Sequence, residues 1–187
     1  MHVALLGGSF NPPHVGHLLA AQYVWATQAL DEVWLMPSFQ HPFRKALVDF
    51  EHRVAMCELL CRDTSGWLKT SRVESEVGGS GRTVDTLTFL KARHPEHQYT
   101  LVIGSDILKD LPNWKDFDRI RQLSRVLVLH RAGYPAAEAV GPPLAEVSST
   151  EVRELLQRGQ SSEVQVEGLV PRAVLAYARK AGLYAAP

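Results

Sequence analysis

Short apolar runs alternate along this chain with longer stretches in which apolar residues recur every three or four positions. The short runs span Val3–Leu6, Val33–Met36, Trp67–Val73, Tyr99–Ile103 and Val126–Leu129. Continuous apolar runs of this length are typical of strands buried on both faces, and the stretches between them have the spacing of helices. The alternation therefore predicts an α/β fold, with a doubly wound parallel sheet and helices on both of its faces.

Residues that start or stop a helix mark the helix boundaries, such as Pro171 at a first turn and Gly159 or Gly182 after a last turn. The expected helices span Val15–Leu30, Phe50–Cys61, Thr83–Arg93, Trp114–Leu123, Thr150–Arg158 and a last segment from Pro171 to Gly182. Gly133–Pro143 is rich in Pro, Gly and Ala and is predicted to be a loop. A chain of 187 residues without a linker or a repeat suits a single domain over residues 1–187, ending in two C-terminal helices.

Charge and hydropathy argue against several classes of function. The chain has 20 Lys plus Arg and 20 Asp plus Glu, so its formal net charge is zero. That balance argues against nucleic acid or an anionic membrane as the main partner. No apolar run reaches the roughly 18 residues of a membrane span, and the N-terminal residues lack the pattern of a signal peptide. We therefore expect a cytoplasmic protein, in which Cys57 and Cys61 are reduced core thiols.

The segment after the first expected strand has the composition of a phosphate site. It reads GGSFNPPHVGH and covers residues 7–17. The glycine pair lets the backbone approach a ligand, and the helix that follows offers free N–H groups and a partial positive charge at its N-terminus. His14 and His17 are three apart, so both can donate to phosphate oxygens from one face of the first turn, with Gly16 keeping that surface open. No third ligand has a convincing spacing for zinc beside these two histidines, so we expect no metal held by the protein at this site.

A second candidate anion site lies late in the chain, where residues 147–153 read VSSTEVR. Ser148 and Glu151 fit a capping box, and a capped helix without any ligand is the simplest interpretation. Ser149, Thr150 and Arg153 add two hydroxyls and a guanidinium to the same helix N-terminus. Because ligands of parallel sheets bind at the carboxyl ends of the strands, we expect both helix N-termini to face that edge.

Together, the two segments resemble the nucleotidyltransferase superfamily that is marked by an H-x-G-H motif. RTVDTL at 82–87, IGSD at 103–106 with LPNW at 111–114, and the C-terminal helix region at 169–184 are similar to one branch. That branch is the nicotinate (nicotinamide) mononucleotide adenylyltransferases. The resemblance implies a Rossmann-like fold and transfer of AMP from ATP to nicotinate or nicotinamide mononucleotide, which forms the dinucleotide and pyrophosphate in NAD biosynthesis.

One segment departs from the branch, which often has P-P-H-K after the second strand. Here residues 37–45 read PSFQHPFRK, with Phe43 and Arg44 in place of the usual Pro-His pair. The role of Lys45 and the choice between the acid and the amide substrate are left open by this departure. The oligomeric state is not indicated by the sequence.

The resemblance implies a role for each candidate residue. The expected catalytic residues are His14, His17, Lys45 and Arg153. The expected ATP-binding residues are Gly8, Ser9, Phe10, Gly104, Asp106, Arg131, Ser149 and Thr150. The expected mononucleotide-binding residues are Ser38, Phe39, Thr83, Thr86 and Trp114, with the indole stacked on the pyridine ring. The implied partners are ATP and a pyridine mononucleotide. Mg²⁺ is expected to arrive bound to ATP.

Two other functions compete with this one. The first is phosphopantetheine adenylyltransferase or another H-x-G-H nucleotidyltransferase, against which the RTVDTL segment and Trp114 argue. The second is a nucleotide-binding regulatory module without turnover, which loss of His17 or Arg153 would have favoured.

Overall fold

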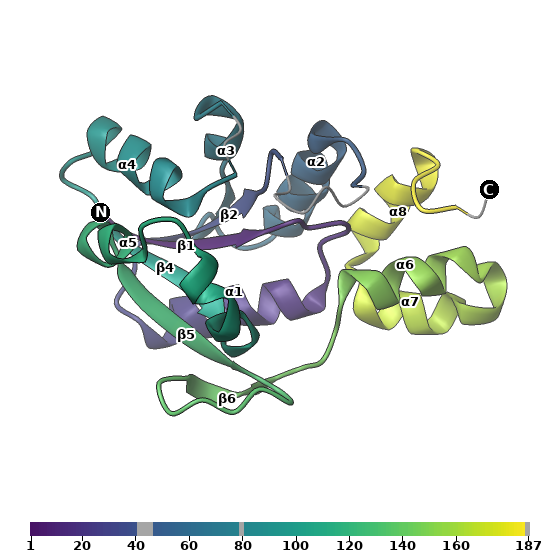
Figure 1. Ribbon diagram of the computed structural model, residues 1–187. Coiled ribbons are helices and arrows are strands. Elements are labelled where there is room, and N and C mark those ends of the chain that lie inside the picture. Colours follow the sequence, from purple (N-terminus) through teal and green to yellow (C-terminus); the bar gives the residue numbers. More distant parts are fainter. Residues whose placement is uncertain (41–46, 79–80, 186–187) are drawn as a thin grey trace.

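A six-stranded sheet, in which all neighbouring strands run parallel, forms the centre of the molecule (Figure 1). The structure is a computed structural model that describes residues 1–40, 47–78 and 81–185. The strands are β1 (His2–Gly8), β2 (Glu32–Pro37), β3 (Leu68–Thr70), β4 (Gln98–Gly104), β5 (Arg125–Arg131) and β6 (Val140–Leu144). Their order across the sheet is β3-β2-β1-β4-β5-β6, so the doubly wound α/β fold is confirmed.

Helices connect the strands and follow the last one. The α-helices are α1 (Val15–Thr27), α2 (Phe50–Cys61), α3 (Val73–Glu76), α4 (Thr83–Arg93), α5 (Phe117–Leu123), α6 (Ser149–Gln157), α7 (Glu163–Leu169) and α8 (Arg172–Lys180). Two 3₁₀-helices, η1 (Ser105–Asn113) and η2 (Gly159–Ser162), complete the set. No helix in the described ranges has the length and apolarity needed to cross a membrane.

The two faces of the sheet bury separate cores, because successive side chains of a strand point to opposite faces. In β1, Ala4 packs with α1, α2 and the C-terminal helices, whereas Val3 and Leu5 pack with α3, α4 and α5. Cys57 and Cys61 lie in the first core, both buried and unbridged, as expected. Burial raises the pKa of both thiols, that of Cys61 to about 11, so they are protonated and inert at neutral pH.

The strand order reverses at β1, which lies between β2 and β4. The chain moves outward from β1 through β2 to β3 and then returns to the other side of β1 as β4. In such sheets this switch point opens a crevice at the carboxyl ends of the two central strands. Figure 1 shows α6, α7 and α8 gathered at the end toward which β1 runs. The fold therefore brings both candidate segments to one edge.

Several local expectations were wrong. The expected loop at 133–143 contains most of β6, an edge strand that pairs only with β5 among the described strands. Pro142 and Pro143 have no N–H to donate, which an edge strand tolerates because one of its sides makes no ladder. The expected helix at 114–123 begins only at Phe117, after the 3₁₀-helix η1. Three α-helices, not two, end the chain, and the short α3 was not expected.

Candidate active site

The N-termini of α1 and α6 face a common cavity of about 600 Å³ at the carboxyl end of the sheet. Its polar lining comes from the two predicted segments and from the ends of β4 and β5. The lining residues are Ser9, Asn11, His14, His17, Leu47, Asp106, Arg131, Val147, Ser148, Ser149, Thr150 and Arg153. Two cationic side chains and two imidazoles in one crevice make a site for a polyanion.

Two hydrogen bonds hold α6 against the loop after β1. The Ser149 hydroxyl donates to the carbonyl of Pro12 at 2.9 Å, and the Arg153 guanidinium donates to the carbonyl of Asn11 at 2.8 Å. Arg153 also donates to the Thr150 hydroxyl at 3.1 Å. The guanidinium is thus held in place at the cavity, with further N–H groups left for a ligand.

Asn11 joins this loop to two other parts of the chain. Its side-chain oxygen accepts from the backbone N–H of Val48 at 3.2 Å and from the Tyr184 hydroxyl at 2.9 Å. Burial raises the pKa of Tyr184, so its hydroxyl stays protonated and able to donate. The buried Arg53 supports the same region, because its guanidinium donates to the carbonyls of Ser9 and Val48. A loop with this many partners is fixed before any ligand arrives.

The His14 and His17 rings lie against each other at the start of α1, with their centroids 3.8 Å apart and their planes tilted by 35°. His14 is the N-cap residue, and its backbone N–H donates to Nδ1 of His17 at 3.2 Å. A backbone N–H can only donate, so Nδ1 of His17 is an acceptor and the neutral ring carries its proton on Nε2. Phe10, fully buried, supports the His17 ring from a centroid distance of 4.7 Å. The local backbone therefore sets the tautomer of His17.

Both imidazoles are neutral at neutral pH. Burial and, less strongly, the charge of Arg131 lower the pKa of His14 to about 4. The pKa of His17 is also well below its usual range, because of burial first and then His14 and Arg131. Nδ1 of His14 is buried and has no hydrogen-bond partner among the described residues. The positive charge of the cavity thus comes from arginines, and the histidines supply neutral polar groups.

Acidification from pH 6.5 toward 4 is expected to destabilise the protein through His14. The unfolded chain protonates this imidazole near pH 6.5, whereas the folded protein does so only near pH 4. Between these values the unfolded state binds more protons, so the stability contribution is full above pH 6.5 and is lost as the pH falls. The slope approaches about 1.4 kcal/mol per pH unit for one group. Urea unfolding at a series of pH values should show that the free energy of unfolding depends less steeply on pH in His14→Gln than in the parent. Equal slopes in the two proteins would show that His14 does not cause this pH dependence.

Asp106 and Arg131 line the cavity from the ends of β4 and β5, with Asp106 Oδ1 3.8 Å from Arg131 Nε. The Ser105 hydroxyl fixes this corner, since it donates to the carbonyl of Tyr134 and accepts from the backbone N–H of Arg131. A side chain at Gly104 would overlap Asp106 Oδ1 and touch Arg131 Cγ. Gly104 therefore gives room to both polar side chains.

A second cavity of about 250 Å³ has a more apolar lining and contains most of the predicted mononucleotide residues. Ser38, Thr83, Thr86 and Trp114 line it, together with glycines at the ends of β1 and β4. The Ser38 hydroxyl is buried and has no partner within the described residues. The Thr86 hydroxyl donates to Glu74 at 2.7 Å. This cavity offers an apolar slot with a few polar groups, which suits a flat ring.

The two cavities adjoin at the switch point of the sheet. Gly8 lines the smaller cavity and the next residue, Ser9, lines the larger one. Likewise, Gly104 lines the smaller cavity and Asp106 lines the larger one. A ligand in one cavity would therefore lie next to a ligand in the other.

Of the predicted site residues that the structure describes, two do not line either cavity with their side chains. The Phe10 side chain is buried in the core, and the predicted contact of Phe10 with the nucleotide was through its backbone. Phe39 packs edge-on against Phe50 at a centroid distance of 5.1 Å. Lys45 lies outside the described residues. The roles given to the candidate residues remain predictions.

Sequence reasoning missed Asn11 and Glu74, two polar residues that line these cavities. Asn11 lies inside the GGSFNPPHVGH segment, but its role in fixing the loop depends on partners far away in the chain. Glu74 lies in the short α3, in no motif, and it adds a carboxylate to the smaller cavity. Burial raises the pKa of Glu74, and the hydrogen bond from Thr86 partly opposes that shift.

Comparisons with known proteins agree with this architecture. A family model described as cytidylyltransferase-like matches residues 5–155. A relative from Myxococcus xanthus, named "Probable nicotinate-nucleotide adenylyltransferase", is 67% identical over 184 residues, covering 98% of this chain and 95% of its own. A relative of the same name from Anaeromyxobacter is 46% identical, covering 97% and 96%.

The fold is also found in a solved structure from Plasmodium falciparum. That protein is a nicotinic acid mononucleotide adenylyltransferase complexed with NaAD. It superposes with a TM-score of 0.85 at 20% sequence identity, covering 98% of this chain and 97% of that one. At this identity the likeness shows a shared fold.

Proposed function

Because the chain belongs to the cytidylyltransferase-like family, and within it to the nicotinate-nucleotide adenylyltransferases, we propose that it transfers the adenylyl group of ATP to nicotinate mononucleotide. The products are the dinucleotide and pyrophosphate, a step of NAD biosynthesis, and we place the reaction in the cytoplasm. One observation carries the proposal at this site: a cavity lined by arginines and imidazoles adjoins a smaller, more apolar cavity at the ends of β1 and β4.

The proposed reaction needs neither a general base nor a covalent intermediate. A phosphate oxygen of the mononucleotide attacks the α-phosphorus of ATP, and a new P–O bond forms. The bond between the α-phosphorus and the oxygen that bridges to the β-phosphorus breaks, and its electron pair leaves with pyrophosphate. The attacking phosphate is ionised near neutral pH. Catalysis then depends on aligning two polyanions and on stabilising the charge of the leaving group.

The polar groups of the larger cavity fit these two tasks. We assign the β- and γ-phosphates to the N-terminus of α6, where Thr150 and Arg153 offer donors. The Nε2–H of His17 is assigned to the α-phosphate, with His14 beside it. A neutral N–H donor held by the backbone stabilises charge without any proton transfer during the reaction.

The smaller cavity is assigned to the mononucleotide, with Trp114 against the pyridine ring and Ser38 and Thr83 as polar contacts. Glu74 gives this cavity a carboxylate that can face the positive pyridinium nitrogen. The acceptor phosphate then points toward the larger cavity across the glycines of β1 and β4.

We propose that Mg²⁺ arrives bound to ATP, as part of the substrate. Among the described residues, Asp106 is the one carboxylate that lines the larger cavity, and it lies beside Arg131. One carboxylate does not make a cage of oxygen ligands, which suits an ion held mainly by phosphates and water. The ion would neutralise charge on the leaving pyrophosphate.

The test is pyrophosphate release from ATP and Mg²⁺ with one acceptor at a time. We expect the fastest release with nicotinate mononucleotide, and slower release with nicotinamide mononucleotide. Release with phosphopantetheine alone would assign the chain to that other branch. Tight ATP binding without release for any acceptor would identify a regulatory module.

Replacing Trp114 by alanine is expected to raise KM for nicotinate mononucleotide by about 5-fold to 100-fold, the usual effect of losing a ring stacked on a base. The KM for ATP should change much less, because Trp114 does not line the larger cavity. Trp25→Ala is the matched control, since Trp25 stacks on Trp67 and lines neither cavity. Equal increases in the two KM values would reject the stacking role.

Replacing Gly16 by alanine is expected to lower kcat about tenfold or more while the protein stays folded. A Cβ at Gly16 would lie 3.0 Å from Nδ1 of His14, so the ring must move, and small displacements at a reacting centre are costly. Gly168→Ala is the control, because no atom lies within 4 Å of a Cβ at that helical position. That variant should keep full activity and gain roughly 0.5 to 1 kcal/mol in urea unfolding. Unchanged kcat in Gly16→Ala would show that the position of His14 does not matter.

A further inference from the structure

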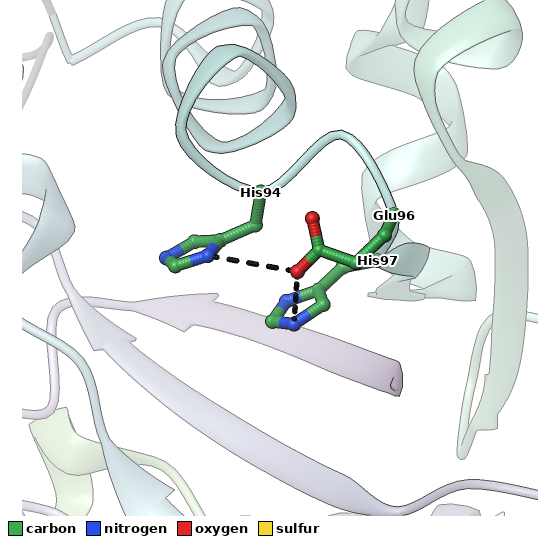
Figure 2. Close-up of side chains that lie close together, drawn as sticks. All are labelled: His94, Glu96 and His97. Carbon is green, nitrogen blue, oxygen red and sulfur yellow. Dashed lines mark ion pairs between the residues drawn. The ribbon is translucent and has the colours of Figure 1, made fainter.

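A cluster of metal-ligating side chains lies outside the two cavities, in the turn between α4 and β4. Of the residues that the structure describes, His94, Glu96 and His97 are the one group of three whose ligand atoms all lie within 4.8 Å of one another. Figure 2 shows one oxygen of the Glu96 carboxylate joined by dashed ion-pair lines to both imidazole rings. We propose that these three side chains bind a divalent transition-metal ion of the Zn²⁺ class, independently of the nucleotide site.

The turn itself brings the three side chains together. His94 is the C-cap residue of α4, and its carbonyl accepts from the backbone N–H of His97 at 3.1 Å. A turn closed in this way places its first and last residues side by side, and Pro95 is favoured at the second position because its φ is fixed. The two rings are stacked at a centroid distance of 4.7 Å and an angle of 9°.

The three ligand atoms are close enough for one ion, but the two rings must first turn out of their parallel stacking so that both nitrogen lone pairs point at it. Glu96 Oε1 lies 3.0 Å from Nε2 of His97 and 3.9 Å from Nδ1 of His94. Two ligands that each lie about 2.1 Å from a tetrahedral ion are about 3.4 Å apart. Two imidazoles and one carboxylate form a ligand set typical of zinc, in which water takes the fourth position.

The surroundings orient one ligand and leave the others accessible. The His97 side chain is only 10% exposed, and its second nitrogen, Nδ1, lies 3.4 Å from the Tyr99 hydroxyl. Such an outer contact to the non-ligating nitrogen is usual for metal-binding histidines. His94 and Glu96 are 38% and 64% exposed, so an ion can reach them from solvent. The cluster also follows the C-terminus of α4, where the helix dipole favours a cation.

The cluster is separate from the nucleotide cavities. His97 immediately precedes β4, whereas Gly104 ends β4 at the opposite edge of the sheet. The seven residues of β4 span roughly 20 Å, at about 3.3 Å per step. An ion here would join the end of α4 to the start of β4 and would have no contact with ATP.

The experiment is a calorimetric titration of the nucleotide-free protein with Zn²⁺, repeated with Co²⁺ and visible absorption to report tetrahedral ligation. We expect one Zn²⁺ per chain. His94→Gln and Glu96→Gln should each weaken binding by about 10-fold to 100-fold or more, since even outer-shell changes have effects of that size. Both side chains are at the surface, so the variants should fold. His52→Gln, which removes a histidine elsewhere in the chain, is the matched control and should bind as the parent does.

Thermal unfolding gives a second readout. At Zn²⁺ about 100-fold above the parent Kd, Tm should rise by about 5 to 10 °C in the parent and in His52→Gln, but by only about 1 to 5 °C in Glu96→Gln. Absence of Zn²⁺ binding in the parent would overturn the proposal. Equal affinity in the parent and in both turn variants would also overturn it, because the ion would then lie at other residues.

Discussion

Replacement of His17 by alanine lowers kcat by about 10²-fold to 10³-fold, if the Nε2–H of this ring stabilises charge at the reacting phosphate. That range is the usual effect of removing one hydrogen-bond donor to a developing negative charge. Binding of ATP should weaken much less, because Arg153 and Arg131 remain in the cavity. Steady-state pyrophosphate release and ATP titration of the same variant would separate the two effects.

A conservative change sharpens this test. His17→Gln places an amide N–H near the position of Nε2 and suits the third position of a helix, so its kcat should lie between those of the parent and His17→Ala. His52→Ala serves as the control, since His52 contacts Tyr177 and lines neither cavity. A kcat near that of the parent in His17→Ala would remove this residue from the mechanism.

Replacement of Arg153 by alanine should lower kcat/KM for ATP by about 10²-fold or more, for two reasons. The variant loses a charge assigned to the β- and γ-phosphates. It also leaves the Asn11 carbonyl without its guanidinium partner, so α6 is held less firmly to the loop after β1. Urea unfolding should show a loss of about 1 to 3 kcal/mol, which is typical of a hydrogen bond to a charged group.

Arg153→Lys should recover little of the kcat/KM that Arg153→Ala loses. A lysine ammonium lacks the planar fork with which the guanidinium can contact Asn11, Thr150 and a phosphate at once. Arg62→Ala is the control, since Arg62 pairs with Asp63 at the surface, where such pairs contribute little. If Arg62→Ala and Arg153→Ala reduced kcat/KM equally, the loss would not come from the phosphate site.

The layers of the fold could be predicted from the sequence because the strands are buried on both faces. Burial leaves continuous apolar runs such as Val3–Leu6, and the helices between them are long enough to show their own period. The failures occur where this signal is absent. Val140–Leu144 is an edge strand that pairs with one neighbouring strand, so it can contain two prolines. In the sequence those prolines indicate a loop. The four-residue helix Val73–Glu76 is too short for any period.

The two helix N-termini that line the larger cavity could be singled out from the sequence, because each carries its own local signal of glycine, hydroxyl or histidine. The contacts that hold these two segments together could not be predicted from the sequence. Ser149 donates to a carbonyl 137 residues away in sequence, and no spacing rule encodes such a pair. Glu74 could not be predicted for a related reason, since its position beside Thr86 is set by the packing of α3 on α4.

The larger cavity is built from segments that lie far apart in the sequence, which determines when it can form during translation. Arg153 and the Tyr184 hydroxyl that anchors Asn11 are translated 142 and 173 residues after Asn11. A nascent polypeptide can therefore pair its central strands well before this cavity is complete. A chain cut short ahead of Ser149 would keep the residues of all six strands but lack the α6 residues that line the cavity.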